Sequence, residues 1–134
     1  MKVLIIDPDT RRARELQRTL AGEGMDVNVA ASASFALTML EWNRHDVVLS
    51  RARIGDMDGH ELCAILKADP GTHHVRFLLV AALPEIQTAQ TRAARVDLIV
   101  PAALPLEALA PLIRRHVPAL ADACICRWTA GRPW

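Results

Sequence analysis

The sequence has no excess of charge of either sign. Its 134 residues include 16 Lys and Arg against 15 Asp and Glu, which gives a formal net charge of +1. A chain so close to neutral presents no broad basic field to nucleic acid, and it carries no acidic tail. We therefore expect no nucleic-acid partner.

Long hydrophobic runs are absent as well. No run reaches the roughly 18–20 apolar residues that a helix needs to span a bilayer. The N-terminal stretch Met1–Asp7 is too short, and becomes acidic too soon, to be a signal peptide. These absences predict a cytoplasmic protein without a membrane contact.

Cysteine is scarce, and the chain contains only Cys63, Cys124 and Cys126. Three thiols are few and odd in number, which argues against a disulfide scaffold and suits a reducing compartment. Zinc sites usually need a wider spacing than that of Cys124 and Cys126, together with four ligands. We expect no metal site, and we expect Cys63 to lie in the core.

Hydrophobic residues are plentiful at 51%, and they gather in short runs that alternate with helical patterns. Runs that are apolar on both faces are typical of parallel strands covered by helices on both sides. The expected strands are Lys2–Ile6, Asp26–Ala30, Asp46–Ser50, Val75–Ala81 and Val96–Val100. The expected helices are Thr10–Glu23, capped by Thr10, then Ser34–Trp42, Gly59–Ala68, Glu85–Ala94 and Pro105–Val117.

Five strands alternating with five helices predict an α/β fold, a doubly wound five-stranded parallel sheet with right-handed crossovers. We expect one domain over residues 1–117 and a C-terminal tail over 118–134. Ligand sites in such sheets lie at the carboxyl ends of the strands. The candidate site therefore lies where these strands end.

The stretch Arg51–Gly59 follows the apolar run Asp46–Ser50 and ends in Met-Asp-Gly. Together with Val3–Asp7 and the turn Ala68–Thr72, it resembles the response-regulator receiver domains of two-component signalling, over residues 2–117. The resemblance implies a flavodoxin-like (βα)5 receiver fold. It also implies a site in which two adjacent acidic residues hold Mg²⁺ and an Asp accepts a phosphoryl group. A hydroxyl and a Lys then bind the phosphoryl oxygens.

The chain departs from this family at the metal-binding and phospho-acceptor positions. Asp7 keeps the first acidic place, Pro8 replaces the second, and Asp9 is acidic one step further on. Arg51 replaces the phospho-acceptor Asp. Because a guanidinium stays protonated, we expect Arg51 to pair with Asp7 as a built-in cation, with Mg²⁺ binding lost or weak. The alternative is that Arg51 extends into solvent.

The remaining family positions depart as well. Ala81 replaces the hydroxyl, Pro101 replaces the Lys, and Leu98 stands where the family often has an aromatic residue that reorients on activation. These losses predict a stand-alone, atypical pseudo-receiver that is not an enzyme and acts as a phosphorylation-independent protein–protein interaction module. Two alternatives stay open: a pseudo-receiver that senses a small molecule, and a residually phosphorylated single-domain response regulator.

Candidate docking residues lie on the first helix and in the tail. Arg11, Arg14 and Arg18 share one helix face by their spacing, and Trp128 and Trp134 are of a type favoured at interfaces. The plainer interpretations are a solvated helix face and tryptophans that dock on their own domain. The resemblance implies partners such as a histidine kinase, a phosphotransfer protein or another regulator, and a homodimer is a further expected arrangement.

Overall fold

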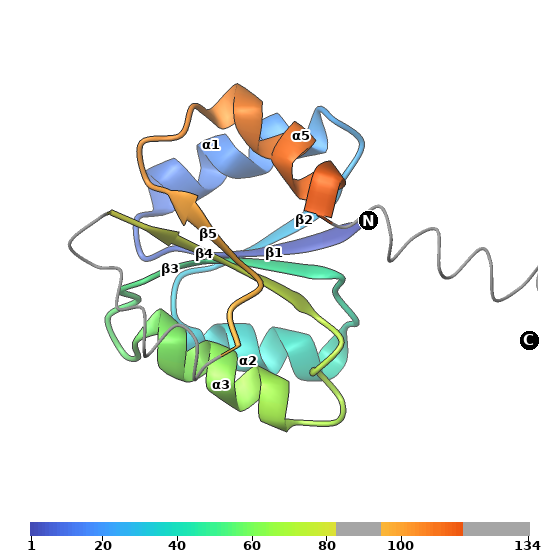
Figure 1. The fold of residues 1–134 in the computed structure, drawn as a ribbon, viewed down its shortest axis with the longest axis vertical. Helices are drawn as coiled ribbons and strands as arrows, with labels where there is room; N and C mark the ends of the chain where they lie inside the picture. The colour runs from blue at the N-terminus through green and yellow to red at the C-terminus, as the bar shows by residue number, and fades with distance from the viewer. Residues whose placement is uncertain (83–94, 117–134) are drawn as a thin grey trace, which may run out of the picture. The chain divides into compact units, whose positions relative to one another are not determined.

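The computed structural model describes residues 1–82 and 95–116. The chain divides into two units, Met1–Leu104 and the part from Pro105 onward. The first unit contains a five-stranded parallel sheet and the helices α1, α2 and α3 (Figure 1). An α/β sheet of this kind is what the alternating pattern of the sequence predicts.

Some of the expected elements lie outside the described residues. These are the helix Glu85–Ala94 and the tail 118–134, which carries Trp128 and Trp134. In the second unit the described helix is α5, Leu106–His116.

The sheet has the strand order β2-β1-β3-β4-β5. The strand bounds are β1 Lys2–Ile6, β2 Asp26–Ala30, β3 Val47–Arg51, β4 Arg76–Ala81 and β5 Leu98–Pro101. β3 ends one residue later than expected because Arg51 still pairs with Val80 of β4. This extension places Arg51 within the sheet rather than in the loop that follows it.

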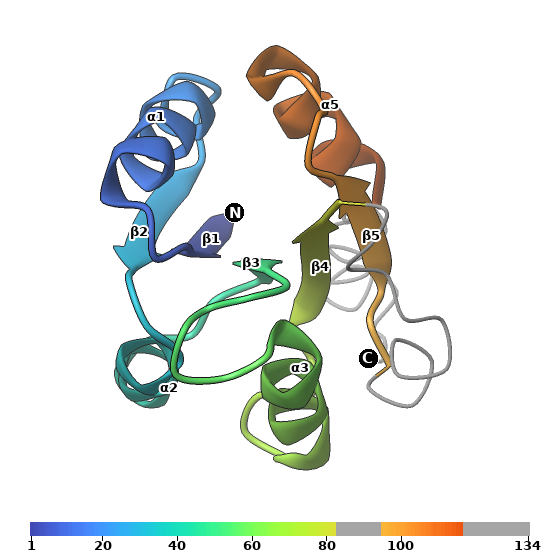
Figure 2. The same cartoon turned by 90° about the vertical axis from the view of Figure 1, so that its left-hand side faces the viewer.

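Helices lie on both faces of the sheet. Their bounds are α1 Thr10–Ala21, α2 Ala33–Trp42 and α3 Gly59–Ala68. α1 lies on one face, whereas α2 and α3 lie on the other (Figure 2). The central strands β1 and β3 are almost wholly buried, which explains why their sequences are apolar without alternation.

α1 begins and ends differently from the prediction. Asp9, rather than Thr10, is its N-cap, and the Asp9 carboxylate accepts hydrogen bonds from the backbone N–H groups of Arg11 and Arg12 at 3.1 and 3.3 Å. A carboxylate suits this position because it satisfies free N–H groups and faces the positive end of the helix dipole. The helix ends at Ala21, earlier than expected.

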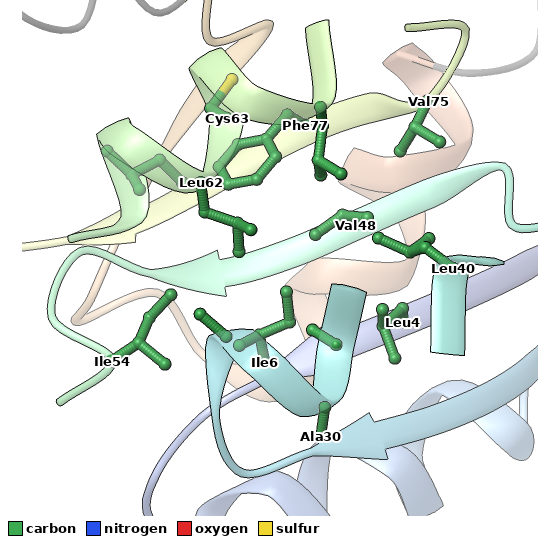
Figure 3. Close-up of a cluster of buried hydrophobic side chains, with 14 of the residues drawn as sticks. Leu4, Ile6, Ala30, Leu40, Val48, Ile54, Leu62, Cys63, Val75 and Phe77 are labelled. Carbon is green, nitrogen blue, oxygen red and sulfur yellow. The ribbon is translucent and has the colours of Figure 1, made fainter. Parts of the chain in front are cut away.

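The core between the sheet and helices α2 and α3 is apolar (Figure 3). Leu4, Val48, Leu62 and Phe77 are fully buried in it. Cys63 lies there too, as the sequence predicts, and burial raises the pKa of its thiol to about 12. A thiol held protonated in this way is a packing group rather than a nucleophile.

Candidate functional site

The ends of four strands bring the predicted site residues to one edge of the sheet. Asp7 directly follows β1, Arg51 ends β3, Ala81 ends β4 and Pro101 ends β5. The register places Arg51 opposite Val80 and Ala81 opposite Pro101. These residues thus lie together at the carboxyl edge of the sheet, where the sequence places them, and their role as a site stays a prediction.

Arg12 of α1 binds the buried carboxylate of Asp7 with two N–H groups. Nε donates to Oδ2 at 2.7 Å and Nη2 donates to Oδ1 at 2.8 Å. The Asp7 side chain is 1% exposed and that of Arg12 is 41% exposed. The hydrogen bond with Asp7 raises the pKa of the Arg12 guanidinium, and the carboxylates of Asp7 and Asp9 add to this effect.

This geometry contradicts the expected pair between Arg51 and Asp7. Both oxygens of Asp7 are engaged by Arg12, and Oδ1 also accepts the backbone N–H of Asp9 at 2.9 Å. Arg12 lies in the first turn of α1, next to the end of β1, whereas Arg51 ends a neighbouring strand. Arg51 forms no ion pair within residues 1–82 and 95–116.

The contribution of Arg12 was missing from the sequence prediction, although a signal for it exists. Residues in a helix advance by about 100° each, since a turn takes 3.6 residues. Arg11, Arg14 and Arg18 therefore share one face, and Arg12 lies well away from it. An Arg that is out of phase with an exposed basic face, and close in sequence to Asp7, is a candidate partner for that carboxylate.

The loop after β3 folds back onto the end of the strand. Gly59 N–H donates to the Ala52 carbonyl at 2.8 Å, and Ala52 N–H donates to the Val80 carbonyl at 3.1 Å. A Cβ at Gly59 would lie 2.5 Å from the carbonyl oxygen of Arg51. Only glycine fits this approach without a shift of the backbone, so the conformation at Arg51 is tightly constrained.

Two aspartates of the same loop bind backbone N–H groups at helix N-termini. The Asp56 carboxylate accepts from the N–H groups of Ala33 and Ser34 and from the Ser34 hydroxyl, at 3.0, 3.1 and 2.9 Å. These hydrogen bonds lower the pKa of the Asp56 carboxyl, and the two from backbone N–H groups contribute most. Asp58 caps α3 by accepting from His60 N–H at 2.7 Å. The loop is thereby fastened to both α2 and α3.

Sequence comparison decides the family. Residues 3–100 match the model of the response regulator receiver domain. The chain belongs to this family. Receiver domains interact with histidine kinases and other signalling proteins, and they are generally signalling modules rather than enzymes.

Two named relatives show how much of a longer protein this receiver corresponds to. The response regulator PleD of Caulobacter vibrioides is 32% identical over 82 residues, which are 61% of this chain and 18% of PleD. The DNA-binding response regulator MtrA of Mycolicibacterium smegmatis is 37% identical over 70 residues, 52% of this chain and 31% of MtrA. The receiver spans less than a third of the length of either relative.

Solved receiver structures share the fold. The chemotaxis response regulator CheY4 of Vibrio cholerae has a TM-score of 0.79 at 22% identity, covering 86% of this chain and 97% of CheY4. The receiver domain of an HD domain-containing protein from Pseudomonas fluorescens Pf-5 has a TM-score of 0.81 at 19% identity, covering 91% of this chain and 90% of the other. The flavodoxin-like receiver fold predicted from the sequence is confirmed.

Four further positions match functional positions of the receiver family, and in this chain they carry no charged or hydroxyl side chain. Ala81 is buried, Pro8 and Pro101 are exposed, and Leu98 is half-buried as the first residue of β5. No side chain at these four positions can hydrogen bond to a phosphoryl oxygen. Among the positions matched to the family, a charged side chain remains at Asp7 and stands at Arg51.

The predicted docking arginines lie on the solvent side of α1. Arg11, Arg14 and Arg18 are exposed, whereas the buried residues of the helix are Ala13, Leu16 and Leu20. Their shared exposed face is as the spacing predicts, and their role in docking stays a prediction.

Residues 1–82 and 95–116 contain no group of three or more His, Cys, Asp or Glu side chains placed to hold a metal ion. In the same part of the chain, no helix combines the length and apolar character needed to cross a membrane.

Proposed function

We propose that this receiver acts without phosphorylation, as a protein–protein interaction module held in one state by Arg12. The proposal rests on the bidentate ion pair between the guanidinium of Arg12 and the buried carboxylate of Asp7. This pair supplies, from within the chain, the positive charge that a receiver site otherwise takes from a metal ion. Such a module is not an enzyme.

The residues at the site do not fit Mg²⁺. Mg²⁺ prefers an octahedral set of oxygen ligands, with one or two carboxylates from the protein. Asp7 already holds Arg12, Pro8 offers no side-chain oxygen, and Asp9 caps α1. The two arginines Arg12 and Arg51 balance the two carboxylates of Asp7 and Asp9, so these four residues have no net negative charge with which to attract a divalent cation.

Within residues 1–82 and 95–116, the site also presents no side chain placed to accept a phosphoryl group. Arg51 carries a guanidinium, which offers no carboxylate oxygen to a phosphoryl group. The neighbouring hydroxyl of Ser50 is fully buried and donates to the Arg51 carbonyl at 3.0 Å, so it is not presented to the site. Asp56 and Asp58 are engaged at helix N-termini.

The proposed partners are signalling proteins of the two-component system: a histidine kinase, a phosphotransfer protein or another regulator, in the cytoplasm. A second copy of the chain is a further candidate. Partner choice is then controlled by surface complementarity and partner concentration rather than by phosphorylation.

The decisive experiment treats the protein with acetyl phosphate and Mg²⁺ and measures its intact mass. We expect no acid-labile adduct of about 80 Da, the mass of one phosphoryl group. A receiver with an intact acidic site, treated in parallel, is the positive control. A stoichiometric acid-labile adduct on this chain would refute the proposal.

A further inference from the structure

A hollow of about 650 Å³ opens on the side of the receiver at the β2 edge of the sheet. It is lined by α1, by the edge strand β2 and by α2, which Figure 2 shows along one side of the molecule. Its main lining residues are Arg14, Arg18, Asn28, Val29, Phe35 and Met39. None of its lining residues is one of the site residues Asp7, Asp9, Arg12 and Arg51.

The α2 wall of the hollow is apolar. Phe35 is 54% exposed, although its aromatic ring is one of the largest apolar groups in the chain. Met39 follows one helical turn later and lines the same hollow. Burial of two such side chains by a partner would favour binding, since exposed apolar area is removed from water.

The α1 wall is positively charged. Arg14 and Arg18 line the hollow, and no ion pair within residues 1–82 and 95–116 neutralises either of them. None of the lining residues carries a carboxylate. Arg11 extends the basic surface along α1, where a second hollow is lined by Arg11, Arg14 and Arg18 with Glu15.

The β2 edge is partly closed to an added strand. A strand that joined this edge would need the free backbone carbonyls of β2. The carbonyl of Val27 already accepts a hydrogen bond from the Gln17 side chain at 3.0 Å. A partner is therefore expected to bind through side chains, as a helix does in a groove, rather than through its backbone.

We propose that this hollow receives an acidic amphipathic helix of a partner protein. The apolar face of that helix packs on Phe35 and Met39, and carboxylates along its edge pair with Arg14 and Arg18. The proposal rests on the proposed function of the chain as an interaction module, and it names the surface and the chemistry of the partner.

The test uses a synthetic helical peptide as the probe. The peptide carries Leu at positions i, i+3, i+4 and i+7 and Glu along both flanks, and a second peptide has Lys in place of every Glu. Affinity for the full chain is measured by fluorescence anisotropy. The binding surface is mapped by the ¹⁵N–¹H NMR shifts of the backbone amides.

Four variants separate the two kinds of contact. Arg14→Glu combined with Arg18→Glu reverses the charge of the wall, and Phe35→Ser removes the aromatic ring. The matched controls are Arg44→Glu and Ile65→Ser, which change an exposed arginine and an exposed apolar residue outside the hollow. All five substituted positions are exposed, and folding of each variant is checked by its circular dichroism spectrum.

We expect the Glu peptide to bind, with amide shifts centred on Asn28, Phe35 and Met39. Affinity should fall by roughly tenfold in the charge-reversed variant and by a similar factor in Phe35→Ser, while both controls bind as the parent does. Binding should also weaken as salt rises.

Several outcomes would overturn the docking proposal: no binding, equal binding of the Lys peptide, equal losses in the controls, or shifts centred on α3. Self-association of the chain through this hollow, seen by sedimentation, would overturn it as well. A phosphoryl adduct from acetyl phosphate contradicts the proposed function instead, and the peptide affinities are measured independently of it. Failure of the peptide to bind a chain that accepts no phosphoryl group overturns the docking proposal alone.

Discussion

At the scale of single residues, Arg12 controls the charge of the site. A planar guanidinium matches the two oxygens of a carboxylate, which an ammonium group cannot do. The Asp7 carboxylate is almost completely shielded from water, so its hydrogen bonds come from Arg12 and from the backbone N–H of Asp9. Loss of Arg12 would leave the buried Asp7 carboxylate with one hydrogen-bond donor, the backbone N–H of Asp9.

Replacement of Arg12 by Gln should therefore destabilise the protein. Removal of one member of a fully buried ion pair costs about 3–5 kcal/mol. Arg12 is partly exposed, and solvent screening lowers the expected loss to about 1–3 kcal/mol. The measurement is the free energy of unfolding from urea titration.

The matched control is Arg11→Gln, because Arg11 is exposed on the adjacent position of the same helix. Its effect should stay within about 0.5 kcal/mol. Equal effects of the two substitutions would contradict the role assigned to Arg12.

The residue scale is also where the sequence was least informative. The predicted pair between Arg51 and Asp7 was wrong, because Arg12 is the cation that binds Asp7. Position in a strand shows which edge of the sheet a residue reaches, but not which of several long side chains fills the space there. That choice depends on the phase of α1 relative to β1, for which the sequence offers only the spacing that sets Arg12 apart from the basic face of α1.

At the scale of elements, the loop from β3 to α3 is held by hydrogen bonds to a strand and to two helices. Backbone hydrogen bonds fold it against the end of β3, and Asp56 and Asp58 fasten it to α2 and α3. Gly59 stands where the loop comes closest to the strand. The start of α3 is thus set by contact with β3 as well as by its cap.

Gly59→Ala should destabilise the protein by about 1–3 kcal/mol, the usual cost of overpacking. The added methyl would lie 2.5 Å from the Arg51 carbonyl oxygen and 2.8 Å from Leu79 Cδ1, so the backbone has to move. Alanine is the better helix former, and a stabilised variant would therefore contradict this packing argument. Thermal unfolding measures the change.

Gly71→Ala is the control for this substitution. The nearest atom to its added Cβ is a side-chain oxygen of Asp69 at 3.4 Å, on an exposed turn. Its unfolding free energy should differ little from that of the parent chain. The comparison separates the close approach at Gly59 from a general effect of removing glycine.

The elements themselves were largely predictable. Buried parallel strands give runs that are apolar on both faces, and α3 was predicted with the bounds that the structure has, Gly59–Ala68. The predicted end of β3 and the predicted cap of α1 were wrong, because one contact sets each of these boundaries. The pairing of Arg51 with Val80 extends β3, and the Asp9 cap starts α1 one residue away from the expected cap.

At the scale of the whole molecule, a buried histidine connects segments at the amino end of the sheet. The Asn28 amide donates to His45 Nε2 at 3.1 Å, and His45 Nδ1 donates to the Asn43 carbonyl at 3.1 Å. His74 Nε2 donates to the His45 carbonyl at 3.2 Å. These partners fit a neutral His45 ring, because a protonated Nε2 would face the Asn28 donor.

The stability of the protein should consequently fall on mild acidification. Burial lowers the pKa of His45 from its ordinary value of 6.5 and does the same for His74. The unfolded chain then binds more protons than the folded one between the lowered pKa and 6.5, so the stabilisation is complete above 6.5 and is lost as pH falls below it. Urea unfolding at a series of pH values between about 7 and 5 measures this slope.

A His45→Gln variant is the comparison for this pH dependence. It should show a shallower slope over the same range, since only the contribution of His74 remains. An unchanged slope would assign the pH dependence to other groups.

The pair of Arg12 and Asp7 joins residues five positions apart in one chain. A tethered cation has a fixed effective concentration at its site, because it cannot diffuse away. A metal ion, in contrast, occupies a site to an extent that follows its concentration in solution. Under the proposed function, the charge of this site does not follow the metal-ion concentration of the cell, and the amount of the protein is the variable that a signalling circuit can adjust.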